Sequence, residues 1–213
     1  MILASIAGAL VATNAVVSAS AAPVLPAEAG AAELVRSCRT MVPSDVDISG
    51  RIVLRNRRGI VQAEYGYALS RRAGETSLRV TDAGGRELEY PKQGPMLGTD
   101  VTWSDITLEY LWWDDFAFDP ERESETVHGQ KCSVLLMKKK GDGDKVPDRA
   151  VRVWVDRRTG AMMQAEEIVD GKAARRLWGT RVKKFGDRWA PNVLEVETLG
   201  SGHRTKITVE DLK

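Results

Sequence analysis

The stretch AVRVWVDRRTGAMMQAEEIV, residues 150–169, decides the fold class of this chain. Apolar positions such as Val151, Val153 and Val155 alternate with other residue types, the turn-forming run 157–160 follows, and a second strand-like run covers 161–169. Alternation with period two is typical of β-strands, and two such runs joined by a short turn indicate a hairpin. The chain is therefore expected to contain an antiparallel sheet.

The same pattern extends from this hairpin in both directions. Strands are expected at 173–184, 189–199 and 205–212 on one side, and at 46–54, 61–69, 78–80, 88–90, 106–113, 121–127 and 131–138 on the other. A helix is expected over 28–41, ended by Pro43. A meander of about ten to eleven strands with few helices must curl or close to cover its apolar face. We therefore expect a mainly β protein with one strongly curved antiparallel sheet and helices packed in its mouth.

The segment GTDVTWSDITLEYLWWDDFAF, residues 98–118, holds three of the six Trp residues of the chain. Thr102 and Asp105 have the spacing of a capping box, which predicts a helical turn. The run 106–113 is strand-like, and in a strand Leu108, Tyr110 and Trp112 would share one face. We expect that face to be the concave interior.

Large aromatic and aliphatic side chains in a β-rich chain are explained by core packing, or as a group by the lining of a ligand cavity. Trp154 alternates with the valines around it, so we expect it on the outer face with Arg152 stacked on its ring. The expected cavity lining consists of Leu54, Tyr67, Leu108, Tyr110, Trp112, Leu136, Val153, Met163, Trp178 and Val182.

Catalytic and metal-binding patterns give little support for an enzyme. His128 and His203 lie beside glycines at expected turns, and no nucleophile, zinc or phosphate-loop motif is found. Asp114 and Asp115 have the chemistry of an acid–base pair, which leaves a hydrolase as a remote alternative; the other interpretation is a polar strand end. We expect no catalytic residue, no metal and no cofactor. Lys+Arg and Asp+Glu number 31 and 30, a balance that argues against nucleic acid as a partner.

The N-terminus predicts export. Residues 1–22 carry no charge, an apolar run covers 2–17, and Ala19-Ser20-Ala21 is a small-residue cleavage pattern. A membrane anchor is the alternative, but the run is shorter than the roughly 20 apolar residues that a membrane span needs. We expect a signal peptide over 1–21 and a single domain over 22–213.

The two cysteines allow two interpretations. In an oxidising compartment Cys38 and Cys132 suggest one disulfide, which would close a loop of about 95 residues and stabilise by up to about 4–5 kcal/mol. The alternative is a pair of buried thiols that pack as small apolar side chains.

Several segments together give the chain a resemblance to the LolA-like outer-membrane lipoprotein-sorting family. The resemblance covers about 33–212 and rests on the segments 49–54, 98–106, 111–113, 129–132, 151–160, 188–191 and 205–207. It implies an incomplete antiparallel β-barrel with helices as a lid over the concave face. In the carriers of this family the cavity takes the acyl chains of lipoproteins that cross the periplasm.

Two functions of different kinds follow from the resemblance. The first is a periplasmic, monomeric, non-enzymatic carrier or receptor for lipid acyl chains or lipoproteins, served by an inner-membrane exporter or an outer-membrane acceptor. An acyl chain gains roughly 0.8 kcal/mol for each buried CH₂ group, so an apolar concave sheet can hold one without specific chemistry. The alternative is a periplasmic sensor or adaptor domain that binds a protein partner.

Overall fold

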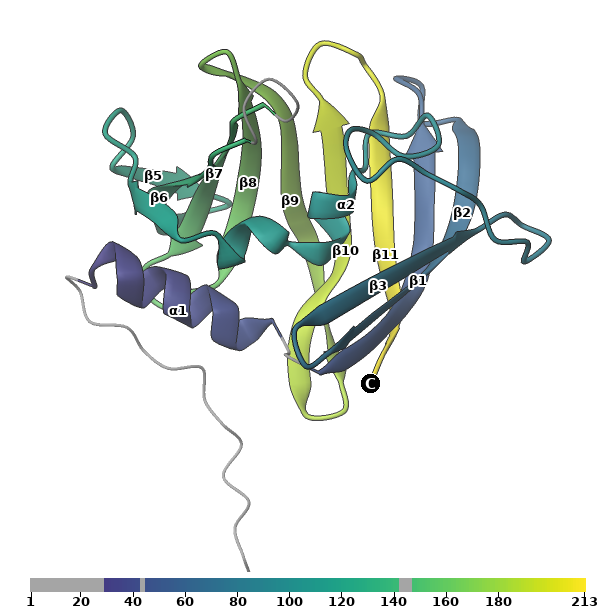
Figure 1. Ribbon diagram of the computed structural model, residues 1–213, viewed down its shortest axis with the longest axis horizontal. Coiled ribbons are helices and arrows are strands. Elements are labelled where there is room, and N and C mark those ends of the chain that lie inside the picture. The colour runs from purple at the N-terminus through teal and green to yellow at the C-terminus, as the bar shows by residue number, and fades with distance from the viewer. Residues whose placement is uncertain (1–28, 43–44, 142–146) are drawn as a thin grey trace, which may run out of the picture.

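The structure, a computed structural model, describes residues 29–42, 45–141 and 147–213 (Figure 1). The expected signal peptide and its cleavage site lie outside the described residues. In the part of the chain that the structure describes, no helix is long and apolar enough to cross a membrane.

In the described residues, one antiparallel sheet of eleven strands forms the body of the protein, and it does not close into a barrel. Its strands are β1 (Val46–Arg55), β2 (Val61–Arg72), β3 (Glu75–Thr81), β4 (Asp115–Phe118), β5 (Ser124–Val127), β6 (Gln130–Lys139), β7 (Arg149–Asp156), β8 (Met162–Val169), β9 (Lys172–Phe185), β10 (Arg188–Thr198) and β11 (Arg204–Leu212). Their spatial order is β3-β2-β1-β11-β10-β9-β8-β7-β6-β4, and β5 also pairs with β6. The curved meander expected from the sequence is therefore confirmed.

Within the part of the chain that the structure describes, three short helices accompany the sheet: α1 (Ala31–Met41), α2 (Trp103–Thr107) and the 3₁₀ helix η1 (Glu109–Trp112). In Figure 1, α1 and α2 lie across the open side of the curved sheet. Helix α1 buries Leu34, Val35 and Cys38, which recur at helical spacing. The expected N-terminal helix and helical lid are thus both present.

The expected strand over 106–113 is wrong. Asp105 accepts the backbone N–H of Thr102, as the capping-box spacing predicted, and α2 begins there. Leu108 then adopts a left-handed conformation, with φ of 52°, which ends α2 and starts η1. The backbone therefore turns twice where the sequence suggested a straight strand, and the alternation argument does not apply to this run.

Two smaller differences concern the strand list. The expected strand at 88–90 is reduced to an isolated bridge between Thr81 and Glu87. Strand β4, which pairs Asp115–Phe118 with β6, was not expected, because its four residues are too few to show a period.

The two faces of the sheet bury separate apolar clusters. The larger cluster lies on the concave side, between the sheet and the segments that cover it, and includes Tyr67, Val153 and Leu177 from the sheet. The smaller cluster joins Trp154 to neighbours on β5 and β6. Successive residues of a strand point to opposite faces, so Val153 and Trp154 define the two sides of β7.

Strands β1 and β11 approach unusually closely at Gly50. A Cβ atom at this position would lie 1.8 Å from the carbonyl oxygen of Thr208, next to an irregularity in the register of the two strands. Only glycine fits there, so Gly50 allows the first and last strands of the sheet to pair.

Candidate functional site

The candidate site is the concave face together with residues 95–113, which we call the lid segment. Met96, Val101, Tyr110, Leu111 and Trp113 of this segment belong to the concave apolar cluster. The segment contains most of the aromatic-rich stretch recognised in the sequence. Polar contacts at its two ends and its middle fix it to the sheet.

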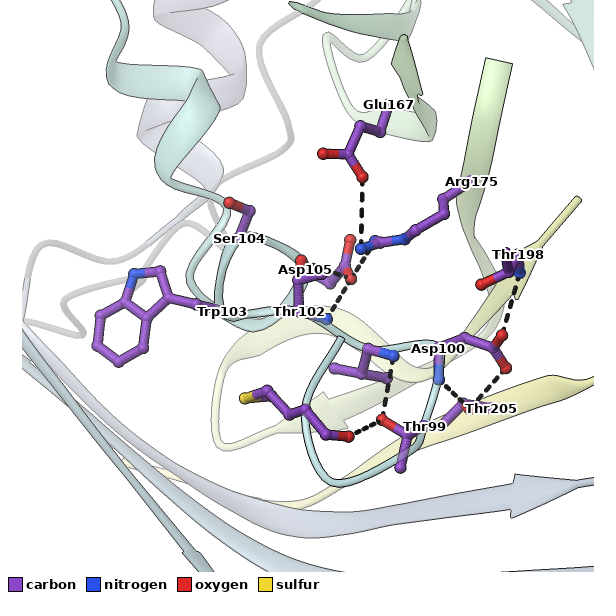
Figure 2. Close-up of polar contacts among 12 residues, drawn as sticks. Thr99, Asp100, Thr102, Trp103, Ser104, Asp105, Glu167, Arg175, Thr198 and Thr205 are labelled. Atoms are coloured by element: carbon purple, nitrogen blue, oxygen red, sulfur yellow. Dashed lines mark hydrogen bonds and ion pairs between the residues drawn. The ribbon is translucent and has the colours of Figure 1, made fainter. Parts of the chain in front are cut away.

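Asp100 makes the first of these contacts. Its Oδ2 accepts a hydrogen bond from Thr205 Oγ1 at 2.8 Å, and its backbone N–H donates to the same hydroxyl at 3.0 Å. Its Oδ1 accepts the backbone N–H of Thr198 at 3.2 Å, as Figure 2 shows. Asp100 and Thr205 are both buried, so the start of the lid segment is held to β10 and β11 by a fully paired carboxylate.

Asp105 makes the second contact. Its Oδ2 accepts from the backbone N–H of Thr102 at 2.7 Å and forms a buried ion pair with Arg175 of β9. Glu167 of β8 lies 3.5 Å from Nη1 of the same guanidinium (Figure 2). One carboxylate therefore both caps α2 and attaches it to the sheet.

Arg149 of β7 makes the third contact. It donates to Glu109 Oε1 at 2.6 Å and to Ser104 Oγ at 2.5 Å, and its guanidinium lies 5.1 Å from the ring centre of Trp113. Burial raises the pKa of the Glu109 carboxyl, but the hydrogen bonds from Ser104 and Arg149 outweigh it and the pKa lies below its ordinary value. Glu109 is therefore charged at neutral pH, and this contact is an ion pair.

Two arginines hold the far end of the lid segment through its carbonyl groups. Arg39 of α1 donates to the carbonyl oxygens of Leu111 at 2.6 Å and Trp113 at 3.2 Å. Arg71 of β2 donates to Thr107 O at 2.5 Å and stacks over Trp112 at 4.7 Å. These bonds satisfy carbonyl groups that the ends of such short helices leave unpaired.

The space that remains under the lid segment is small and partly polar. A cavity of about 20 Å³ lies among Tyr110, Arg175, Val151 and Leu177. Nε and Nη1 of Arg175 are buried without hydrogen-bond partners. The volume is about that of one water molecule, so an acyl chain can occupy the concave face only if the lid segment moves.

Comparisons with known proteins agree with this architecture. A protein-family model described as "Uncharacterized protein" matches residues 86–213, more than half of the chain. The chain belongs to this family. A comparison with curated proteins found no match.

Three solved structures share the fold over most of their length. A DUF1329 family protein from Desulfovibrio piger aligns with a TM-score of 0.61 and 18% identity, covering 84% of this chain and 90% of that one. A putative outer membrane lipoprotein-sorting protein domain from Vibrio parahaemolyticus aligns with a TM-score of 0.60 and 17% identity, covering 88% of this chain and 93% of that one. A LolA superfamily protein from Nitrosomonas europaea aligns with a TM-score of 0.57 and 13% identity, covering 87% of this chain and 93% of that one. The fold of this chain is LolA-like, as its resemblance to that family implied.

Half of the residues expected to line a cavity lie on the covered side of this LolA-like sheet. Tyr67, Val153 and Tyr110 belong to the concave cluster, and Leu108 packs against it from the lid segment. Leu54 is buried opposite Thr205, whose hydroxyl contacts the lid segment, so it faces the same side.

Three other expected lining residues lie on the opposite face. Leu136 sits between Leu135 and Met137, which both belong to the concave cluster. Met163 packs with Trp154 in the convex cluster. Trp178 follows Leu177, which belongs to the concave cluster, so Trp178 points to the other face. There Arg204 stacks over its ring at 5.1 Å. The alternation was interpreted correctly, but the wrong set of alternate residues was placed inside.

Trp112 and Val182 are exposed, with 41% and 63% of their surface accessible. Trp112 is exposed because η1 rotates it away from the sheet, and Val182 because it lies on a part of β9 that has left the main sheet. The expectation that these two residues line a cavity is wrong for this closed arrangement.

Trp154 lies on the outer face, as expected, but it is not stacked with Arg152. Its ring is 1% exposed, and its indole N–H donates to Glu125 Oε2 at 2.9 Å. Arg152 instead pairs with the buried carboxylate of Asp119. Strand β5 and the turn before it therefore cover this part of the convex face.

The residues that hold the lid segment were missed in the sequence, apart from Asp105 in its capping role. Arg175 lies 70 positions from Asp105 in the chain, and Thr205 lies 105 positions from Asp100. The one available signal was an arginine, Arg175, at an inward position of a strand, where a charge needs a partner. Among the described residues, no group of three or more His, Cys, Asp or Glu side chains could hold a metal ion.

Both cysteines are free, buried thiols in the structure. Cys38 Sγ donates to Gly160 O at 3.2 Å in the concave cluster, whereas Cys132 belongs to the convex cluster. The sheet separates the two sulfur atoms, which corresponds to the second interpretation left open by the sequence.

The thiols of the native protein are expected to resist alkylation at pH 8. Burial raises the pKa of the Cys38 thiol to about 12 and that of Cys132 to about 11, so less than about one thiol in a thousand is ionised and reactive. Titration with a chromogenic disulfide reagent should count no thiols in the native protein and two after denaturation in guanidinium. A count of zero after denaturation would instead establish a disulfide.

Proposed function

We propose that this protein is a non-enzymatic carrier or receptor that takes an acyl chain of a lipid or lipoprotein between its concave face and the lid segment. The observation that carries the proposal is that apolar and polar contacts are separated at this face. Its interior is an apolar cluster, while the segment above it is fastened by separate polar contacts around Asp100, Asp105 and Glu109. Such contacts can be exchanged for water when the lid segment lifts, and the apolar surface below cannot.

The free energy gained by burying an acyl chain is similar in size to the free energy lost when the polar contacts of the lid segment break. Sixteen buried CH₂ groups contribute about 13 kcal/mol. Hydrogen bonds to charged groups contribute about 1.5–3 kcal/mol each, so breaking the three main contacts costs about 5–9 kcal/mol. A long acyl chain that takes over the apolar contacts of the lid segment therefore compensates for breaking these three polar contacts, whereas a short one does not.

The cellular setting of the proposal is the periplasm. It is supported by the signal peptide expected over 1–21 and by the LolA-like fold, which a putative lipoprotein-sorting domain from Vibrio parahaemolyticus shares. In that setting the cargo would arrive from an inner-membrane exporter and leave to an outer-membrane acceptor.

Weakening one lid contact is expected to speed uptake of an acyl chain. Thr205→Val keeps the shape of the side chain but removes the hydroxyl that contacts Asp100, which costs about 1–3 kcal/mol of lid closure. The open population then rises about fivefold to 150-fold, and so does the association rate of a fluorescent sixteen-carbon fatty acid. Stopped-flow fluorescence measures this rate, and native mass spectrometry of protein from a membrane-containing host detects bound lipid.

Thr208→Val is the matched control, because this threonine lies on the same strand, is only half-buried, and donates its hydroxyl to the carbonyl oxygen of Arg51 rather than to the lid segment. It should leave the association rate unchanged. Equal rates for the parent and Thr205→Val would show that the lid segment does not gate entry. Absence of stoichiometric probe binding in all three proteins, together with a protein partner in pull-down, would favour the sensor or adaptor function instead.

A further inference from the structure

Strands β9 and β10 continue past the sheet as a two-stranded ribbon. The last pair of β9 with β8 joins Trp178 to Gln164, and the last pair of β10 with β11 joins Val193 to Thr208. Beyond these pairs the two strands bond only to each other, up to Phe185 and Arg188. At about 3.3 Å per residue, the ribbon extends roughly 20 Å past β8. In Figure 1 its turn lies at the lower end of the molecule.

This ribbon carries more positive charge than the rest of the protein. By sequence, residues 181–188 contain four basic residues and the single acid Asp187, a formal charge of +3 against +1 for the whole chain. The side chains of Arg181, Lys183 and Lys184 are exposed.

Few acidic side chains neutralise the ribbon. Asp187 lies 3.9 Å from Lys184 and is fully exposed, so this pair is weak. Asp211, at the end of β11, is close enough to Lys183 for their charges to interact. Its carboxylate is, however, already paired with Lys213 at 2.7 Å. Most of the positive charge therefore faces solvent.

An apolar residue lies within the charged run. Val182 follows Arg181 and precedes Lys183, and its 63% exposure is the highest among the exposed large apolar side chains of the described residues. Exposing a valine side chain to water is unfavourable. At the boundary between lipid headgroups and acyl chains, the same side chain flanked by cations is in a favourable environment. Basic residues there bind anionic headgroups while the apolar side chain enters the lipid.

We propose that the β9–β10 ribbon docks this protein on a bilayer surface that contains anionic phospholipids. Charge complementarity and the exposed Val182 carry the inference, and it does not depend on acyl-chain binding under the lid segment. The ribbon supplies reversible attachment, because three exposed cations and one aliphatic side chain are too few for insertion.

The test compares two triple variants that lose the same charge. Arg181→Gln/Lys183→Gln/Lys184→Gln removes the ribbon cations, and Arg55→Gln/Arg57→Gln/Arg58→Gln removes an exposed basic cluster at the opposite end of the sheet. Each protein is sedimented with vesicles of equal parts phosphatidylglycerol and phosphatidylcholine, and with vesicles of phosphatidylcholine alone. Circular dichroism confirms that both variants are folded.

The parent and the Arg55/Arg57/Arg58 variant are expected to bind the anionic vesicles, and the ribbon variant to bind on the order of 100-fold more weakly, at about fivefold per cation. Binding should disappear at about 1 M salt, where charges are screened beyond about 3 Å. The proposal is overturned if the parent does not bind, if neutral vesicles bind equally well, or if the two triple variants lose the same affinity. A ribbon variant that keeps full vesicle binding also overturns it.

Discussion

An Asp105→Asn variant is expected to have a free energy of unfolding about 3–5 kcal/mol below that of the parent protein. Asparagine can still accept the backbone N–H of Thr102, so the cap of α2 is retained. The charge that neutralises Arg175 is lost, and two nitrogens of this buried guanidinium already lack a hydrogen-bond partner. The remaining carboxylate, Glu167, is at 3.5 Å and partly exposed, so it compensates only in part.

Urea unfolding followed by circular dichroism measures this loss, and a double-mutant cycle identifies its cause. Arg175→Met alone is expected to be similarly destabilised, because it leaves the carboxylate buried. Asp105→Leu/Arg175→Met removes both charges and should recover most of the stability, since paired apolar replacements of buried ion pairs are often neutral. Additive losses in the double variant would show that the two side chains do not act as a pair.

Trp154→Ala is expected to destabilise the protein by about 3–5 kcal/mol, which lowers the melting temperature by roughly 10 °C in a chain of this size. The side chain is almost completely buried on the convex face against Val134 and Cys132. Its removal leaves a cavity beneath β5 and frees Glu125 from its hydrogen bond. Differential scanning calorimetry measures the change.

Trp112→Ala is the control with the same change of side chain. Trp112 is largely exposed and loses mainly its stacking with Arg71, so we expect a cost of about 1 kcal/mol or less. If both variants melted at the same temperature, the convex cluster would not contribute to stability as its burial indicates.

The sequence predicted the sheet well, because long strands repeat their pattern often enough to be recognised. Strand β7 alternates over its whole length, and Val153 and Trp154 were placed correctly on opposite sides. The strand expected over 106–113 was wrong because a short apolar stretch does not distinguish strand from helix, and because a single left-handed residue, Leu108, separates two short helices there. Trp178 failed for another reason: alternation separates two faces but does not tell which face is covered.

The contacts that close the site could not be predicted from local pattern. Asp100 and Thr205 meet only because β11 lies in the centre of the sheet, next to β1. Their pairing depends on strand order, and strand order depends on which apolar faces cover each other over the whole domain. The capping role of Asp105 was visible locally, whereas its pairing with Arg175 was not.

The position of β11 also determines the order of folding. Strand β1 pairs with β11 from Ile48–Leu212 to Arg55–Arg204, so the first strand to be synthesised has the last as its neighbour. Until the C-terminal residues are available, β1 and β10 each present an unpaired edge and Ile207 is missing from the concave cluster. Contacts between such distant segments form slowly, because a loop of about 150 residues must close first. The domain therefore completes its fold only once β11 is available to pair with β1.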